Sequence, residues 1–189
     1  MSDPSTSLRS QILIAMPTLY DPSFSKTITL ICEHSAKEGA MGIVLNQPTS
    51  LDIHELMEAK KTKQKDNSLH SIKIHSGGPV DTNHGFILHD CETNDDLSIQ
   101  IAPRLFLSSS TGIIEKIAQG EGPDNQIIAL GYASWSPGQL ETEITANSWL
   151  TTDYEHKLVF ETPANIQWIE AGKRLGIDLN LLTTQAGHA

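Results

Sequence analysis

Three glycine-rich corners lie at residues 39–48, 77–80 and 131–141, and the first and third also carry amide or acidic side chains. Glycine permits the tight backbone turns at which small binding sites often form. Amides at such turns either satisfy buried backbone groups or contact a ligand, and the sequence leaves both alternatives open. The candidate ligand-binding residues are Asn46, Gln47, Gly77, Gly78, Gln139 and Glu141.

The segment 131–141 is expected to turn from a strand into a helix. Pro137 suits the first helical position, with the serine before it as the cap. Gly131 should lie where the backbone turns or where another segment approaches, because a side chain there would clash. Gln139 and Glu141 would then lie at the positive end of the helix, and we expect this mouth to face the first corner.

Two pairs of cysteine and histidine, in residues 32–34 and 89–91, have a spacing that could hold a metal. Residues i and i+2 of a strand point to the same face, so two neighbouring pairs could form a tetrahedral site. The spacing is not that of common zinc motifs, and a cysteine in an apolar strand behaves as a small buried hydrophobe. We therefore expect no metal and no cofactor.

Serines at two positions could serve as nucleophiles. Residues 108–111 precede an expected helix, whose dipole would favour an oxyanion, but the same residues are ordinary helix caps. Ser134 follows a strand and precedes a helix, but the Gly-x-Ser-x-Gly sequence of a nucleophile elbow is absent. We assign no catalytic residue.

The composition is that of a single globular domain, with 189 residues of which 38% are hydrophobic and 19% charged. Two cysteines do not make a disulfide framework. The N-terminus is polar, and no apolar run is long enough for a signal peptide or a membrane span. We expect residues 1–10 to be a disordered lead-in and 11–189 to form one cytoplasmic domain without a membrane partner.

The formal net charge of −10 repels phosphate backbones, so direct nucleic-acid binding is not expected. Four lysines in residues 60–65 form the one basic cluster. We interpret it as a solvated loop after a helix, with a patch for nucleic acid or an acidic partner as the alternative.

Hydrophobic patterning predicts more strands than helices. The predicted strands are residues 11–16, 27–33, 40–45, 71–75, 85–89, 97–101, 126–133, 149–152 and 158–160. The predicted helices are 51–60, capped near Thr49, then 111–119, and one helix opening at each of Pro137 and Pro163. Residues 34–39 are too few for a parallel crossover, so the strands on either side pair antiparallel if they are neighbours. This order indicates an α+β fold with a mixed, mostly antiparallel sheet.

Many separated motifs together resemble the YqgE/AlgH family of small, largely uncharacterised bacterial proteins, over residues 10–189. They lie at residues 13–24, 32–34, 39–46, 77–80, 85–89, 129–133, 135, 138–141, 147–150 and 186–189. The resemblance implies a bent sheet closed into a pseudo-barrel and flanked by about four helices. This chain departs from the family with Lys26 and His84, where arginine is frequent, and with Ser134, where glycine is usual.

The family resemblance carries no established catalytic residues, and its name includes a proposed role in regulating alginate genes. We expect a non-enzymatic binding or regulatory module that acts through a protein or small-molecule partner. One alternative is a hydrolase or transferase with an unrecognised site near the glycine corners. Another is a transcription-linked regulator, against which the acidic net charge counts.

Overall fold

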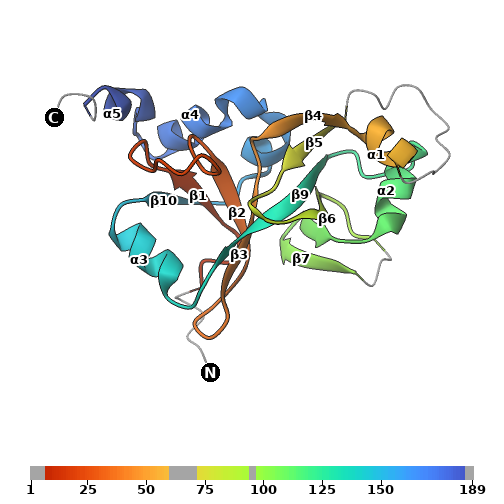
Figure 1. The fold of residues 1–189 in the computed structure, drawn as a ribbon, viewed down its shortest axis with the longest axis horizontal. Helices are drawn as coiled ribbons and strands as arrows, with labels where there is room; N and C mark the ends of the chain where they lie inside the picture. Colours follow the sequence, from red (N-terminus) through yellow and green to blue (C-terminus); the bar gives the residue numbers. More distant parts are fainter. Residues whose placement is uncertain (1–6, 60–71, 94–96, 186–189) are drawn as a thin grey trace.

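The computed structural model describes residues 7–59, 72–93 and 97–185. Its strands form one curled sheet of ten strands (Figure 1). The strands are β1 (Gln11–Ala15), β2 (Ile28–Ser35), β3 (Gly39–Val44), β4 (Pro48–Asp52), β5 (Lys73–Ser76), β6 (Val80–His89), β7 (Ser98–Ala102), β8 (Leu105–Ser108), β9 (Gln126–Trp135) and β10 (Trp149–Asp153).

The sheet is mixed and mostly antiparallel, as the sequence predicts. Its main path runs β10-β1-β2-β3-β9-β6-β8-β7, with β4 and β5 attached to one side. Strands β2 and β3 pair antiparallel across their short turn, and β5 with β9 is the parallel pair. The α+β class and the bent, pseudo-barrel sheet are therefore confirmed.

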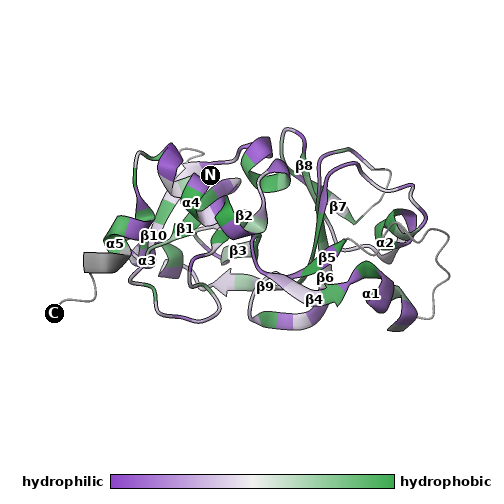
Figure 2. Ribbon diagram, turned by 90° about the horizontal axis from the view of Figure 1, so that it is seen from above, coloured by the Kyte–Doolittle hydropathy of each residue, from purple (hydrophilic) through white to green (hydrophobic). Residues whose placement is uncertain are grey.

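Strand β9 carries the bend of the sheet. Its first half pairs with β5 and β6, whereas its last residues, from Ala133 to Trp135, pair with β3. Figure 2 shows β9 running between the group that holds β1 to β3 and the group that holds β5 to β8. Gly131, in the middle of β9, has a φ of 75°, which is the left-handed region that favours glycine.

Five α-helices lie in the described residues: α1 (Ile53–Ala59), α2 (Thr111–Ala118), α3 (Gln139–Thr145), α4 (Ala164–Arg174) and α5 (Leu179–Gln185). Helices α3 to α5 lie near β1 and β10, and α1 and α2 lie at the opposite end of the molecule (Figure 1). No helix of the described segments combines the length and apolar character that a bilayer span requires.

The apolar side chains form three buried clusters. The largest fills the curl of the sheet and includes Ile12, Leu30 and Leu107. A second packs α1 and α2 against β5, β6 and β9. The third contains Trp135 and Trp149, beneath Leu140 of α3. The curl of the sheet is thus closed from within by packing, as in other small barrels.

Several predicted elements were wrong in type or position. The apolar run 158–160 is not a strand but part of a π-helix, η3 (Lys157–Glu161). Helix α3 begins at Gln139 after a left-handed Gly138, so Ser136 does not cap it. Helix α1 is capped through Asp52 and Glu55, each of which accepts a bond from the other's amide.

Strands β4 and β8 and helix α5 were not anticipated. Segment β4 looks like a helix start in the sequence because Thr49 and Asp52 have capping chemistry, yet it pairs with β5. The lysine cluster of residues 60–65 lies outside the described residues. Of the expected lead-in, Leu8 and Arg9 contact β2.

Candidate functional site

The mouth of the curled sheet opens into a cleft of about 1060 Å³. Strands β2, β3, β6, β7, β8 and β9 all contribute to its wall. The cleft floor consists of the apolar side chains Met41, Phe86, Leu97, Ile99, Leu107 and Tyr132. The mouth of a barrel-like sheet is one of the places where ligands commonly bind.

The floor is continuous with the hydrophobic core. Met41, Phe86 and Tyr132 are only partly buried and pack against the largest core cluster. Phe86 and Tyr132 meet edge to face, with ring centroids 5.8 Å apart. On the β7 side, Leu97 is 58% and Ile99 39% exposed. The cleft therefore presents apolar surface to solvent where the core ends.

Arg9 joins the two ends of the curl beside the cleft. Its Nε donates to the Cys32 carbonyl of β2 at 3.1 Å, and its Nη2 donates to the Gln100 carbonyl of β7 at 2.6 Å. These charge-assisted bonds hold two strands that are far apart in the order of the sheet. Arg9 thus closes the curl and fixes the position of β7.

His34 connects the cleft to α3. Its Nδ1 accepts the Leu8 amide at 3.0 Å, so the ring proton lies on Nε2, which donates to Glu141 at 2.9 Å. The His34 side chain is 5% exposed, and that of Glu141 is 48% exposed. Glu141 thus reaches the cleft only through His34, and it is not itself one of the residues that line the cleft.

Asn46 and Gln47 bind backbone groups. Asn46 accepts the Ile28 amide at 2.8 Å and donates to the Lys26 carbonyl at 2.9 Å, while Gln47 donates to the Ser23 carbonyl. Asn46 thus lies at the Ile28 end of β2. Glu141 lies at the other end, beside His34, and six residues of strand span about 20 Å. The structure does not bring these two candidates together.

The glycine corners are places of close backbone contact. A Cβ on Gly77 would lie 2.3 Å from the Gly131 carbonyl oxygen, and a Cβ on Gly78 would lie 2.2 Å from the Tyr132 carbonyl carbon. A Cβ on Gly131 would lie 2.6 Å from the Gly78 oxygen. The prediction for Gly131 is confirmed, and this packing accounts for all three glycines without a ligand.

Gln139 serves the start of α3. Its Oε1 accepts the Ser136 amide, and its Nε2 donates to Glu143. Glu143 in turn accepts the indole N–H groups of Trp135 and Trp149 at 2.9 and 2.8 Å. Gln139 and Glu143 therefore fasten the helix that carries Glu141.

The residues of the two Cys/His pairs have other partners. Cys32 is buried in the core, and this burial raises the pKa of its thiol to about 12. His89 contacts the Ser108 hydroxyl and the Cys91 carbonyl through its two ring nitrogens. In the described ranges, no group of three or more His, Cys, Asp or Glu side chains could hold a metal ion.

Two of the serine candidates bond to groups within the fold. Ser110 caps α2 by accepting the Gly112 amide at 3.0 Å. Ser108 lies 2.8 Å from His89, which would suit a nucleophile and its base, but both residues are fully buried. Ser134 is exposed on β9 and lines the cleft.

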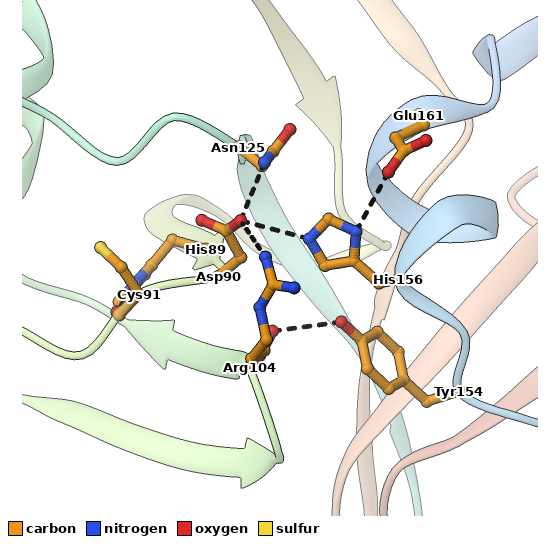
Figure 3. Close-up of polar contacts among 8 residues, drawn as sticks. All are labelled: His89, Asp90, Cys91, Arg104, Asn125, Tyr154, His156 and Glu161. Atoms are coloured by element: carbon orange, nitrogen blue, oxygen red, sulfur yellow. Dashed lines mark hydrogen bonds and ion pairs between the residues drawn. The ribbon is translucent and has the colours of Figure 1, made fainter.

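A polar network that was not anticipated fastens the C-terminal segment to the sheet (Figure 3). Asp90 accepts from Asn125 at 2.8 Å and from His156 at 3.2 Å, and it pairs with Arg104 at 3.5 Å. The other ring nitrogen of His156 faces Glu161 at 3.4 Å. None of these described residues lines the cleft, so we assign the network to stability.

The Asp90 network predicts a stability effect that depends on pH. Burial alone would raise the pKa of Asp90, but hydrogen bonds from Asn125 and His156 outweigh it and hold this pKa below its ordinary 3.8. We expect Asp90→Asn to lower the free energy of unfolding at pH 7 by about 2 kcal/mol, the scale of hydrogen bonds to a charged group.

The lowered pKa sets the direction of the pH effect. The contribution of ionised Asp90 is complete above pH 3.8 and is lost as the pH falls through the lowered pKa. Urea unfolding should therefore show the difference between wild type and Asp90→Asn shrinking below about pH 4. A difference that grows as the pH falls below about 4 would contradict this account.

The chain is similar to known bacterial proteins over nearly its whole length. A family model described as AlgH-like matches residues 12–180. A UPF0301 protein of Saccharophagus degradans is 44% identical over 97% of this chain and 89% of its own length. The solution structure of the AlgH protein from Pseudomonas aeruginosa covers the whole chain, and 99% of that protein, with a TM-score of 0.79 at 40% identity. A Corynebacterium diphtheriae crystal structure, at 19% identity and a TM-score of 0.71, covers 92% of this chain and 90% of its own and shares the fold.

Proposed function

Since the chain belongs to the AlgH-like family, whose relatives' names state no activity, we propose a function from the geometry: a binding module whose ligand site is the cleft. The observation that carries this proposal is the exposed apolar floor at the mouth of the sheet. Leu97 and Ile99 stand at the solvent beside the partly buried rings of Phe86 and Tyr132. Contiguous apolar surface with a polar rim is typical of a site that receives another molecule.

The chemistry at the cleft favours binding over catalysis. His34 uses both ring nitrogens for Leu8 and Glu141. The pair of Ser108 and His89 is sealed from solvent. A nucleophile needs both a base within hydrogen-bond reach and access to the substrate. Ser108 has a base in His89 but is buried away from any substrate. The proposal is accordingly a non-enzymatic module.

Of the candidate ligand-binding residues, Glu141 acts in this function through His34, which it holds at the wall of the cleft. Asn46 and Gln47 instead bond to backbone groups at and before the start of β2. Gly77 and Gly78 allow the close backbone contacts at the bend of β9. We include a cytoplasmic location and a regulatory role in the same proposal, with a role linked to transcription as the alternative. Such a role would depend on the partner that occupies the cleft.

A neutral apolar dye tests the site with a matched pair of variants. Ile99 in the cleft and Ile166 on α4 are both 39% exposed. We expect Ile99→Asp to weaken the binding of Nile red about tenfold or more, because a carboxylate beside an apolar ligand must be desolvated. Fluorescence titration measures this effect, and Ile166→Asp should leave the affinity within about twofold because the dye does not contact that site.

The dye titration can fail in two ways. Equal losses in the two variants would show that the dye does not bind in the cleft. Wild-type protein that gives no saturable dye signal would contradict the accessible apolar floor. Far-UV circular dichroism of both variants keeps loss of fold apart from loss of binding.

A further inference from the structure

The charge at the rim of the cleft is negative. Glu33, Glu38 and Asp81 line it and are exposed, whereas Arg9 is the only lysine or arginine among its described lining residues. The Arg9 guanidinium already donates to two main-chain carbonyls. Carboxylates therefore dominate the field at the mouth, and a positively charged ligand is attracted.

The positions of these charges favour an extended ligand. Glu33 lies on β2 and Glu38 in the turn after it, while Asp81 lies on β6. The apolar floor extends between these strands to β7. The cleft volume of about 1060 Å³ is at the upper end of the range for small-molecule pockets, about 300–1000 Å³, and leaves room for a larger ligand. A chain with several charges and apolar side chains fits this arrangement better than a single small cation.

Strand β7 adds a surface for main-chain hydrogen bonds. It is the last strand of the main sheet path, and it pairs with β8 alone among the described strands. The Gln100 carbonyl points away from β8, since it accepts from Arg9. Alternation along the strand points the main-chain groups of Ser98 the same way, which leaves that end open to a pairing segment.

We propose that the cleft binds an extended peptide segment of a partner protein, with apolar residues flanked by lysine or arginine. This inference rests on the proposed function and specifies the occupant of that same site. The apolar residues lie over Phe86, Ile99 and Tyr132, and the basic residues face the carboxylates of the rim. The peptide main chain pairs with the Ser98 end of β7.

Fluorescence anisotropy with three labelled nine-residue peptides tests the occupant. The first has leucine and phenylalanine between pairs of lysines, the second replaces lysine with glutamate, and the third replaces the apolar residues with serine. We expect the first peptide to bind wild-type protein at least about tenfold more tightly than either other, because it alone matches both floor and rim.

Matched triple variants separate the rim from the overall charge. We expect Glu33→Gln, Glu38→Gln and Asp81→Asn together to weaken the first peptide about tenfold. The control set removes three exposed carboxylates on α2 or just after it, with Glu115→Gln, Glu121→Gln and Asp124→Asn. The control should change affinity by less than about twofold, because none of these three carboxylates lines the cleft and salt screens exposed charges that do not contact the ligand.

The outcomes separate this inference from the proposed function. If the lysine and glutamate peptides bind equally well, the proposal that the ligand is a basic peptide is wrong. Equal losses of affinity in the two triple variants would contradict it as well. Dansylcadaverine binding as tightly as the first peptide would overturn it in favour of a small cation. If Nile red still distinguishes Ile99→Asp from Ile166→Asp in these cases, the cleft remains a binding site. Failure of that pair as well would remove the proposed function itself.

Discussion

Replacing Gly131 with alanine should lower the free energy of unfolding by about 4 kcal/mol, the sum of a steric and a conformational cost. The new Cβ would lie 2.6 Å from the Gly78 oxygen and 2.9 Å from the Val80 oxygen. Both neighbours are backbone atoms, one between β5 and β6 and one at the start of β6, so neither can rotate away as a side chain could. Urea unfolding followed by tryptophan fluorescence measures the change.

Gly120 supplies a matched control for this experiment. Its φ of 74° equals that of Gly131 within a degree, but a Cβ there would meet nothing within 4 Å. Gly120→Ala should therefore cost only the left-handed conformation, about 1 kcal/mol. If the two variants lose the same stability, the close crossing at the bend is not what requires glycine at 131.

The second large loss of stability is expected when Glu143 is replaced, because its carboxylate accepts hydrogen bonds from two buried indoles. Trp135 and Trp149 are 3% and 2% exposed, and both donate to Oε2 of Glu143. Glu143→Ala leaves both N–H groups without this acceptor, at about 1–3 kcal/mol each when burial is complete. We expect a loss of about 3 kcal/mol, since Glu143 is partly exposed and water can reach the gap.

Two control variants separate loss of the hydrogen bonds from loss of a surface glutamate. Glu143→Gln keeps an oxygen that can accept from the indoles, so it should lose about 1 kcal/mol. Glu115→Ala removes an exposed glutamate from α2 and should change stability by less than about 0.5 kcal/mol. A Glu143→Ala protein as stable as the Glu115→Ala protein would show that the indole bonds add nothing to stability.

The sequence predicts the parts of this fold that depend on local patterns. The antiparallel pairing of β2 and β3 follows from the short turn between them, and the crowded position of Gly131 follows from its place in a strand. The prediction of a strand at residues 158–160 was wrong because three apolar residues fit a strand and a buried helical turn equally well. The secondary structure of such a short segment depends on its tertiary contacts, which the sequence does not show.

The candidate site was less accessible to sequence reasoning, because the curl of the sheet creates it. Arg9 and Gln100, which meet beside the cleft, are 91 residues apart in the sequence. Nothing in the local sequence around Phe86 or Tyr132 shows that they line one floor. The alternation of Leu97 and Ile99 was a usable signal, since these apolar residues stay at the surface.

The amides at the first glycine corner have backbone partners that the sequence does not show. An asparagine after a strand can satisfy the neighbouring backbone, and Asn46 does so through both ends of its amide. The choice between that role and a ligand contact depends on which backbone groups lie within reach, and only the folded chain shows them.

Methyl NMR tests the cleft as the ligand site most directly. Protein labelled at isoleucine and methionine methyl groups is titrated with indole, a small neutral aromatic molecule. We expect saturable shifts at Ile99 and Met41, which line the cleft, and none at Ile166 on α4 or at Met57, which is buried between α1 and its neighbours. Shifts that are as large at Ile166 as at Ile99, or their absence from both cleft methyls at saturating indole, would contradict the account.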